Sequence, residues 1–148
     1  MKIDRSEHVP YSPGQMFDLV NDIEAYPEFL EWCLAAKVEN RFDRGLEATI
    51  DIGFRGVNKS FATRNRLDRP HRIDMELLSG TFSHLEGAWI FSGTAGVGSE
   101  VRLVLNFQVT RSPFSRVFAL LFEELVRSQI KAFSVRAKEL YSEGKLLS

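Results

Sequence analysis

Residues 112–140, "SPFSRVFALLFEELVRSQIKAFSVRAKEL", form the longest stretch with helical periodicity in the chain. Ser112 is placed to cap a helix and Pro113 suits its first turn. Apolar side chains then recur three and four positions apart, which puts them on one face of a helix. They are Phe114, Val117, Phe118, Leu121, Leu125, Phe133, Ala137 and Leu140. A helix over 113–140 is about 40 Å long at 1.5 Å per residue, and its apolar stripe needs a partner surface.

The middle of the chain supplies that surface, because its apolar residues alternate with period two. "LEATIDIGF", residues 46–54, shows the pattern most simply. Alternation of this kind predicts strands with one buried face. We expect them at 34–42, 46–54, 59–67, 72–78, 82–92 and 100–109, with a polar strand at 2–9. The intervening turns are short, so consecutive strands should pair antiparallel.

A short helix should precede these strands. Ser12, Pro13 and Gln15 have the spacing of a capping box with proline at the first helical position. Its apolar face comprises Met16, Phe17, Val20 and Ile23. The step from Tyr26 to Pro27 should end the run, since a residue before proline is driven to extended backbone.

These elements predict an α+β fold in one domain, residues 1–148. A curved antiparallel sheet of six to seven strands should wrap around the long C-terminal helix. A curved sheet that grips a helix leaves space between them. With 12 phenylalanines in the chain, that space should be an apolar ligand cavity.

Composition excludes several classes of protein. The net charge of −1 does not recruit polyanions as a whole, so DNA binding is not expected. The single cysteine excludes an internal disulfide and fits a reducing cytoplasm. The start of the chain lacks a signal peptide, and "VFALLF", the longest apolar run, is far shorter than the ~20 residues of a membrane span. We therefore expect a cytoplasmic protein.

The residues capable of catalysis do not form a recognisable constellation. Cys33 lacks protease or redox spacing and is expected to be a buried, inert thiol. His84 and Glu86 lie on one face of a strand, and we interpret them as a surface pair. No metal-ligand spacing accompanies them. The expectation is a protein that is not an enzyme and needs no metal.

Five stretches carry a resemblance to a known family, and the resemblance runs from about residue 3 to 141 in unbroken order. They are "VPYSPGQMFDLVNDIEAYPEFLEWC", "KSFATRNRLD", "GTFSHLEGAWIF", "RLVLNFQV" and "AFSVRAKELY". The chain resembles the coenzyme Q-binding START-like proteins of the polyketide cyclase/dehydrase superfamily, a group that includes the ribosome association toxin RatA.

The resemblance implies the helix-grip fold, also called START/Bet v 1-like. It further implies a non-catalytic carrier of ubiquinone or a related isoprenoid lipid that supports respiration. Such a carrier requires no cofactor beyond the bound ubiquinone, and it makes peripheral contact with the inner membrane. The alternative is a translation inhibitor of the RatA type that binds the large ribosomal subunit. A cyclase or aromatase ranks third, because it needs polar groups inside the cavity and the sequence offers no convincing inward-facing acid or base.

The predicted ligand site has walls and a gate. The family's Tyr-Pro-x-Phe motif falls on Tyr26, Pro27 and Phe29, and its sheet tryptophan falls on Trp89. The walls are predicted to be Trp89, Phe91, Leu103, Leu105, Phe107, Phe118, Phe122, Leu125 and Phe133. The gate is predicted to be Tyr26, Pro27, Phe29, Leu30 and Trp32.

Two surface features have functional interpretations of their own. A basic run over two strands comprises Lys59, Arg64, Arg66, Arg69 and Arg72. Besides being a solvated outer sheet face, it can attract lipid headgroups, at ~1 kcal/mol per basic residue, or ribosomal RNA phosphates. Ala88 and Ile90 on the expected outer face, and the apolar front of the last helix, indicate extra apolar contact surface.

Overall fold

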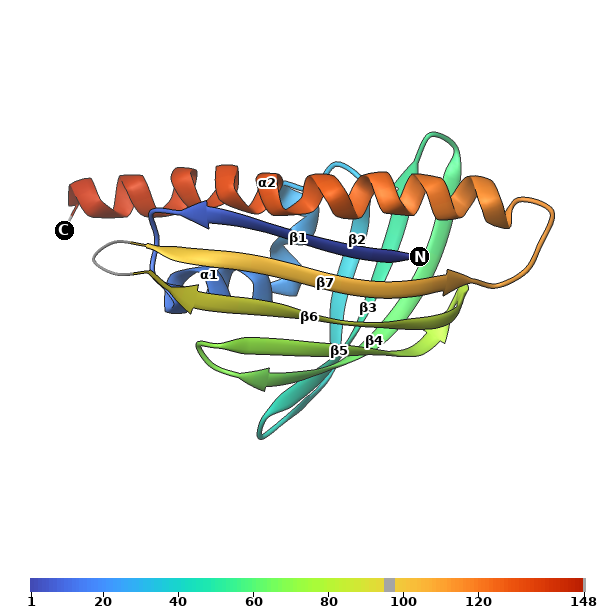
Figure 1. Cartoon of the computed structure of the whole chain (residues 1–148), viewed down its shortest axis with the longest axis horizontal. Coiled ribbons are helices and arrows are strands. Elements are labelled where there is room, and N and C mark those ends of the chain that lie inside the picture. Colours follow the sequence, from blue (N-terminus) through green and yellow to red (C-terminus); the bar gives the residue numbers. More distant parts are fainter. Residues whose placement is uncertain (95–97, 148) are drawn as a thin grey trace.

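A seven-stranded antiparallel sheet and one long helix dominate the computed structural model, which describes residues 1–94 and 98–147, with side chains up to Tyr141 (Figure 1). The elements are β1 (Lys2–Val9), α1 (Pro13–Asn21), the 3-10 helix η1 (Ile23–Glu28), β2 (Cys33–Phe42), β3 (Gly45–Phe54), β4 (Val57–Asp68), β5 (Arg72–Gly80), β6 (Phe82–Gly93), β7 (Ser99–Val109) and α2 (Ser115–Leu147). Every strand predicted from periodicity is confirmed, with ends that differ by a few residues.

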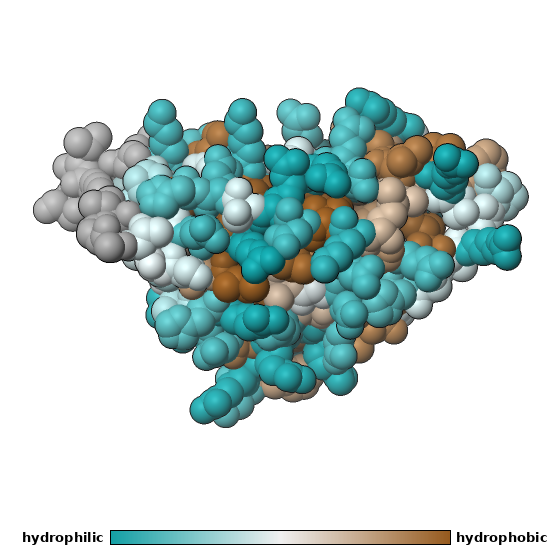
Figure 2. All heavy atoms as spheres, viewed as in Figure 1, coloured by the Kyte–Doolittle hydropathy of each residue, from teal (hydrophilic) through white to brown (hydrophobic). Residues whose placement is uncertain are grey.

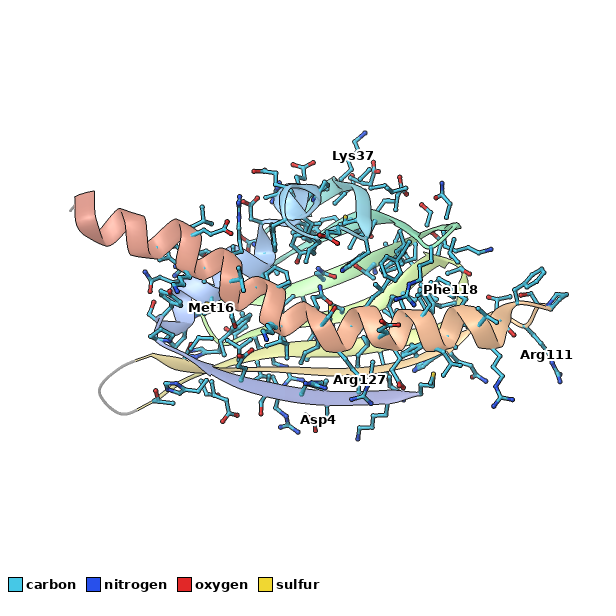
Figure 3. The ribbon with its side chains drawn as sticks, turned by 90° about the horizontal axis from the view of Figure 1, so that it is seen from above. Asp4, Met16, Lys37, Arg111, Phe118 and Arg127 are labelled. Atoms are coloured by element: carbon cyan, nitrogen blue, oxygen red, sulfur yellow. The ribbon has the colours of Figure 1, made fainter. Side chains whose placement is uncertain are left out.

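The strand order is β1-β7-β6-β5-β4-β3-β2, so the only non-sequential neighbours are β1 and β7. Register shifts interrupt the pairing of β2 with β3, β4 with β5 and β6 with β7. Such irregularities bend and twist a sheet locally. The strands β2, β3 and β4 accordingly cross the direction of β1, β7 and β6, and α2 lies along the sheet (Figures 1 and 3). The helix-grip prediction is confirmed.

The C-terminal helix begins at Ser115, two residues later than predicted. Ser112 does not act as the expected cap; its carbonyl accepts hydrogen bonds from the Ser115 N–H (3.1 Å) and hydroxyl (2.9 Å). Phe114 therefore precedes the first helical turn and is 76% exposed. Leu140 and Val117 are also exposed, which corrects their assignment to the buried stripe. The other members of the stripe are buried: Phe118, Leu121, Leu125, Phe133 and Ala137.

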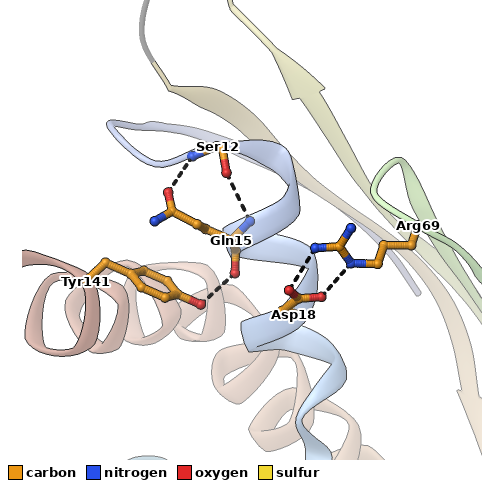
Figure 4. A network of polar contacts seen from close by, with 5 residues as sticks. All are labelled: Ser12, Gln15, Asp18, Arg69 and Tyr141. Atoms are coloured by element: carbon orange, nitrogen blue, oxygen red, sulfur yellow. Dashed lines mark hydrogen bonds and ion pairs between the residues drawn. The ribbon is translucent and has the colours of Figure 1, made fainter. Parts of the chain in front are cut away.

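The start of α1 is the predicted capping box. The Gln15 N–H donates to Ser12 Oγ (3.1 Å), and the Ser12 N–H donates to Gln15 Oε1 (2.9 Å). The Tyr141 hydroxyl donates to the Gln15 carbonyl (2.8 Å), which ties α1 to α2 (Figure 4). Asp18 accepts two hydrogen bonds from the Arg69 guanidinium, at 2.8 and 2.9 Å, which ties α1 to the turn before β5.

The prediction of extended backbone at Tyr26 is wrong. Tyr26 and Pro27 both lie inside η1, after α1 has already ended at Asn21. Tertiary contacts override the local preference: the buried Tyr26 hydroxyl donates to the Val20 carbonyl. The Leu30 N–H also donates to the Tyr26 carbonyl (2.9 Å), which closes the turn.

Candidate functional site

The front half of the interface between α2 and the sheet is filled by aromatic rings. Phe118 and Phe122 of α2 meet rings from β4, β6 and β7, with centroids 4.8–6.1 Å apart. We call these rings the aromatic cluster: Phe61, Phe82, Phe107, Phe118 and Phe122. Phe107 and Phe118, predicted as cavity walls, pack within the cluster and do not line the cavity.

Behind the aromatic cluster lies a small cavity of about 70 Å³. It is enclosed by η1, the β3–β7 part of the sheet and the middle of α2. Seven predicted site residues line it: Tyr26, Trp32, Trp89, Leu103, Leu105, Phe122 and Leu125. The lining also includes Ile23, Ile50, Phe61, Met75, Leu85 and Val126.

The remaining predicted site residues lie elsewhere. Phe29 and Phe133 pack on Tyr26 in a second aromatic group, with centroids 5.3–6.1 Å apart. Phe91 packs on Phe17 of α1 (5.7 Å). Leu30 is buried outside the cavity lining, and Pro27 is exposed on the surface of η1. The Tyr-Pro-x-Phe motif thus packs η1 against α2, with only Tyr26 at the cavity.

The cavity is far smaller than the apolar content of the sequence suggested. Sites for small molecules are typically ~300–1,000 Å³. Composition does not distinguish rings that line a space from rings that fill it, and here most fill it. A cavity of about 70 Å³ holds a few atoms of a ligand, so a whole quinone ring requires the walls to move.

Three polar side chains face the cavity: Thr63, Asn65 and Gln129. Thr63 and Asn65 are each only 6% exposed, and the Thr63 hydroxyl donates to Asn65 Oδ1 (2.9 Å). None of the three was predicted. The signal was nevertheless present in the alternation of "FATRNRL", residues 61–67, where Thr63 and Asn65 share a face with Phe61.

Among the side chains that the structure describes, no charged one lines the cavity. Burial raises the pKa of the Tyr26 phenol, which therefore stays protonated and is not a base. Burial also raises the pKa of Cys33 to about 11, so its thiol is not a nucleophile at neutral pH. Among the described residues there is no group of three or more His, Cys, Asp or Glu side chains that could hold a metal ion.

The predicted basic run does not lie on one face of the sheet. Lys59 is paired opposite Ile52, a fully buried residue, which places Lys59 on the concave side. Arg69 forms an ion pair with Asp18 of α1. Outside the run, His84 pairs with Glu86 on the surface, as the sequence predicted (3.3 Å). Spacing explains the correction, because strand residues an odd number of positions apart face opposite ways.

The other arginines of the run border a hollow of about 690 Å³ on the outer sheet face, over β4–β7. Lys2, Arg64, Arg66 and Arg72 line it together with Asp74, Glu76 and Glu86. Its floor includes Ala88, Ile90 and Val104, and Figure 2 shows hydrophobic residues between charged side chains on this side. Arg64 binds Glu47 (2.7 Å) and Arg72 binds Asp74 (2.9 Å), so much of the positive charge is neutralised.

The residue before α2 and the first turns of that helix carry the second apolar surface that the sequence indicated. Phe114, Val117 and Leu120 are 76%, 63% and 55% exposed. Figure 3 shows the start of α2, near Arg111, extending past the body of the sheet. Among the described helices, none combines the length and the apolar character needed to cross a membrane.

The family model described as "Polyketide cyclase / dehydrase and lipid transport" matches residues 9–134. The chain belongs to this family. It is 36% identical to the ribosome association toxin RatA of Escherichia coli K12, over 95% of this chain and 89% of that protein. It is 27% identical to the mitochondrial coenzyme Q-binding protein COQ10 homolog B of Xenopus laevis, over 92% of this chain and 57% of that protein.

A START superfamily protein from Mycobacterium smegmatis has the same fold. Its TM-score is 0.79 at 18% identity, with 94% of this chain and 98% of that chain covered. The START-like family and the helix-grip fold, both expected from the resemblance, are thereby confirmed. The ribosome-binding hypothesis now ranks ahead of the ubiquinone-carrier hypothesis, because the chain is more similar to RatA (36% identity) than to the COQ10 homolog (27% identity).

Proposed function

We propose that this protein associates with the ribosome, in the manner indicated by the name of its RatA relatives, and that it binds the large subunit. One observation carries the proposal: 36% identity over 95% of this chain and 89% of the relative. The match extends over nearly the whole of both proteins, so it includes surface residues as well as core positions.

The outer-face hollow is the surface we assign to this contact. It combines an apolar floor with basic side chains, and ribosomal RNA presents phosphates that basic side chains bind. Arg66 is the informative residue, because it lies on the hollow and forms no ion pair with any residue that the structure describes. Arg64 is less informative, since its loss would also strand the half-buried Glu47.

Co-sedimentation with purified large subunits tests the proposal. We expect binding at about 50 mM salt that weakens toward about 200 mM, because phosphate contacts release counterions. Arg66→Glu should weaken binding, whereas Arg111→Glu, the same charge change in the segment before α2, should not. Absence of co-sedimentation at low salt contradicts the proposal; equal losses in both variants contradict the assigned surface.

A second candidate function is the binding of an apolar small molecule in the cavity. The observation that favours it is the cavity itself, with two tryptophans and three polar side chains on an apolar wall. The chain also resembles, at 27% identity, a protein whose name states coenzyme Q binding. Mass spectrometry of lipids extracted from the purified protein tests it, and protein that is consistently empty contradicts it.

We propose that neither function is enzymatic and that neither needs a cofactor. A cyclase requires a general acid or base near its substrate. The polar groups of the described lining residues are hydroxyl, amide and indole groups, none of which is ionised at neutral pH. Incubation with a poly-β-ketone mimic should therefore give no cyclised product above the uncatalysed rate.

A further inference from the structure

The cavity contains an amide that the protein itself leaves without a full set of partners. Asn65 is 94% buried, since its exposure is 6%. Its carbonyl oxygen accepts from Thr63, which fixes the orientation of the side chain. Its amide nitrogen makes no hydrogen bond to any residue that the structure describes. Among the described residues, the fully buried side-chain polar atoms without a partner are Asn21 Oδ1 and Arg136 Nε, so the Asn65 nitrogen keeps some accessible surface and is open to a ligand.

The chemistry of this position is that of a hydrogen-bond donor. Because Thr63 occupies the acceptor end of the amide, the NH₂ group is the end left for a ligand. The cavity that Asn65 lines is also bounded by Leu103, Leu105 and Trp89, which are apolar and almost fully buried. Since none of the described lining residues is charged, an ionised ligand group would find no counter-charge among them.

We infer that the Thr63–Asn65 pair is an anchor for a neutral, otherwise apolar molecule that carries a hydrogen-bond-accepting oxygen, such as a carbonyl. This inference rests on the second candidate function, the binding of an apolar molecule in the cavity, and specifies the ligand's chemistry and orientation. The oxygen lies at the Asn65 amide, and the apolar remainder points away from it.

The exposure of the lining residues gives the direction of entry. Trp89, Leu103 and Leu105 are at most 5% exposed and form the floor. Trp32, Ile50 and Gln129 are partly exposed and form the rim. A molecule whose oxygen reaches Asn65 therefore extends its apolar part past Trp32 and Gln129. The cavity of about 70 Å³ fits the oxygenated end alone, so the rim must yield to the rest.

A pair of probes that differ in oxygen content tests the inference. They are a ubiquinone with one isoprene unit, whose ring carries carbonyl oxygens, and n-hexylbenzene, which carries none. Trp32 and Trp89 are the chain's 2 tryptophans, and both line the cavity. Their fluorescence reports quinone binding directly, and calorimetry measures both probes. Asn65→Leu removes the donor, and Gln129→Leu is the matched control at the rim.

We expect Asn65→Leu to weaken quinone binding by about fivefold to tenfold, the value of one neutral hydrogen bond. Hexylbenzene should bind that variant as well as, or better than, the wild type. Thr63→Val, which frees the Asn65 amide to turn, should lower quinone affinity in the same direction and serves as a second variant if Asn65→Leu does not fold.

The outcomes distinguish a failure of the second candidate function from a failure of the Thr63–Asn65 anchor alone. If the wild type binds neither probe, the second candidate function is wrong and the anchor is wrong with it. If both probes bind but the variants change their affinities equally, the cavity is a ligand site and the anchor alone is overturned. A larger loss in Gln129→Leu than in Asn65→Leu also overturns it, because the oxygen would then lie at the rim.

Discussion

The two halves of the interface between α2 and the sheet are built in opposite ways. At the front, the five rings of the aromatic cluster pack at centroid distances of 4.8–6.1 Å. Further along, Leu125, Val126 and Gln129 lie over Thr63 and Asn65 with a space of about 70 Å³ between them. At ~24 cal/mol per Å³, such a space represents roughly 2 kcal/mol of packing that the fold does without. We call the part that contains the aromatic cluster the front half and the part that contains the cavity the hollow half, which is distinct from the hollow on the outer sheet face. The front half is packed for stability, and the hollow half is not.

The largest expected effect comes from breaking the front half. Phe82 is 4% exposed and contacts four other rings of the aromatic cluster. Phe82→Ala should lower the free energy of unfolding by about 3–5 kcal/mol. Urea unfolding followed by circular dichroism measures the change. A loss below about 2 kcal/mol would show that the front half relaxes around the missing ring, contrary to the packing described above.

The matching change in the hollow half should cost less. Leu125→Ala enlarges a space that is already present, so fewer close contacts are lost; we expect about 2–3 kcal/mol, the low end of the range for such truncations. The same unfolding measurement compares the two variants. If Leu125→Ala destabilises the protein as much as Phe82→Ala does, the two halves do not differ in packing.

The next effect concerns how the hollow half is closed. Its cover is η1 and the segment to Trp32, which follow α1 and its capping box. Ser12→Ala should cost about 1 kcal/mol and should speed the modification of Cys33, the single cysteine, by a thiol reagent at pH 8. Ser115→Ala, which removes a hydroxyl at the start of α2, is the control and should leave that rate unchanged. Equal acceleration in both variants would mean that Cys33 reports global unfolding alone.

Burial of the front half could be predicted from sequence, and so could seven residues that line the cavity, but the size of the cavity and the tight packing of the front rings could not. Phe118 and Phe122 lie on the helix face that meets strands rich in phenylalanine. Their burial is predicted whichever rings they meet, because the hydrophobic effect is non-directional. A cavity depends on which ring meets which, and Phe107 turned out to fill the space it was expected to wall. Register shifts, such as the one between Ala62 and Thr63, bend a sheet locally and are likewise not encoded by alternation.

Thr63 and Asn65 show a different limit of prediction from sequence, which concerns polar residues on a buried face. Their period-two spacing with Phe61 is enough to place them on the concave face, yet polar residues on a strand are ordinarily assigned to solvent. The same spacing shows that Lys59 and Arg64 face opposite ways. The face on which each of these four side chains lies was therefore predictable from alternation. The hydrogen bond that the Asn65 oxygen accepts from Thr63 was not.

A smaller, stabilising effect should follow from making the hollow half apolar. In Thr63→Val combined with Asn65→Leu, both partners of a buried hydrogen bond are replaced together, which is often neutral or favourable. The larger leucine also fills part of the cavity. We expect stability to rise by about 1 kcal/mol or to stay unchanged, measured by urea unfolding. A loss above about 2 kcal/mol would show that the polar pair is structural, in contrast to the role inferred for it.

The smallest effect is a pH dependence at α1, the helix that precedes η1 in the chain. Hydrogen bonds from Arg69 lower the pKa of Asp18 below its ordinary value of 3.8. The stabilisation is therefore fully present above that ordinary pKa, and it is lost as pH falls through the lowered value of the folded state. Asp18 and Arg69 are both more than half exposed (54% and 58%), so solvent and salt screen the contribution.

Asp18→Asn should thus be slightly less stable than the wild type near pH 7, and the two stabilities should converge as the pH falls toward about 2. Urea unfolding across this range, at low salt and at about 1 M salt, measures the convergence. A difference that is independent of both pH and salt would mean that Asp18 supports α1 by packing and not by charge.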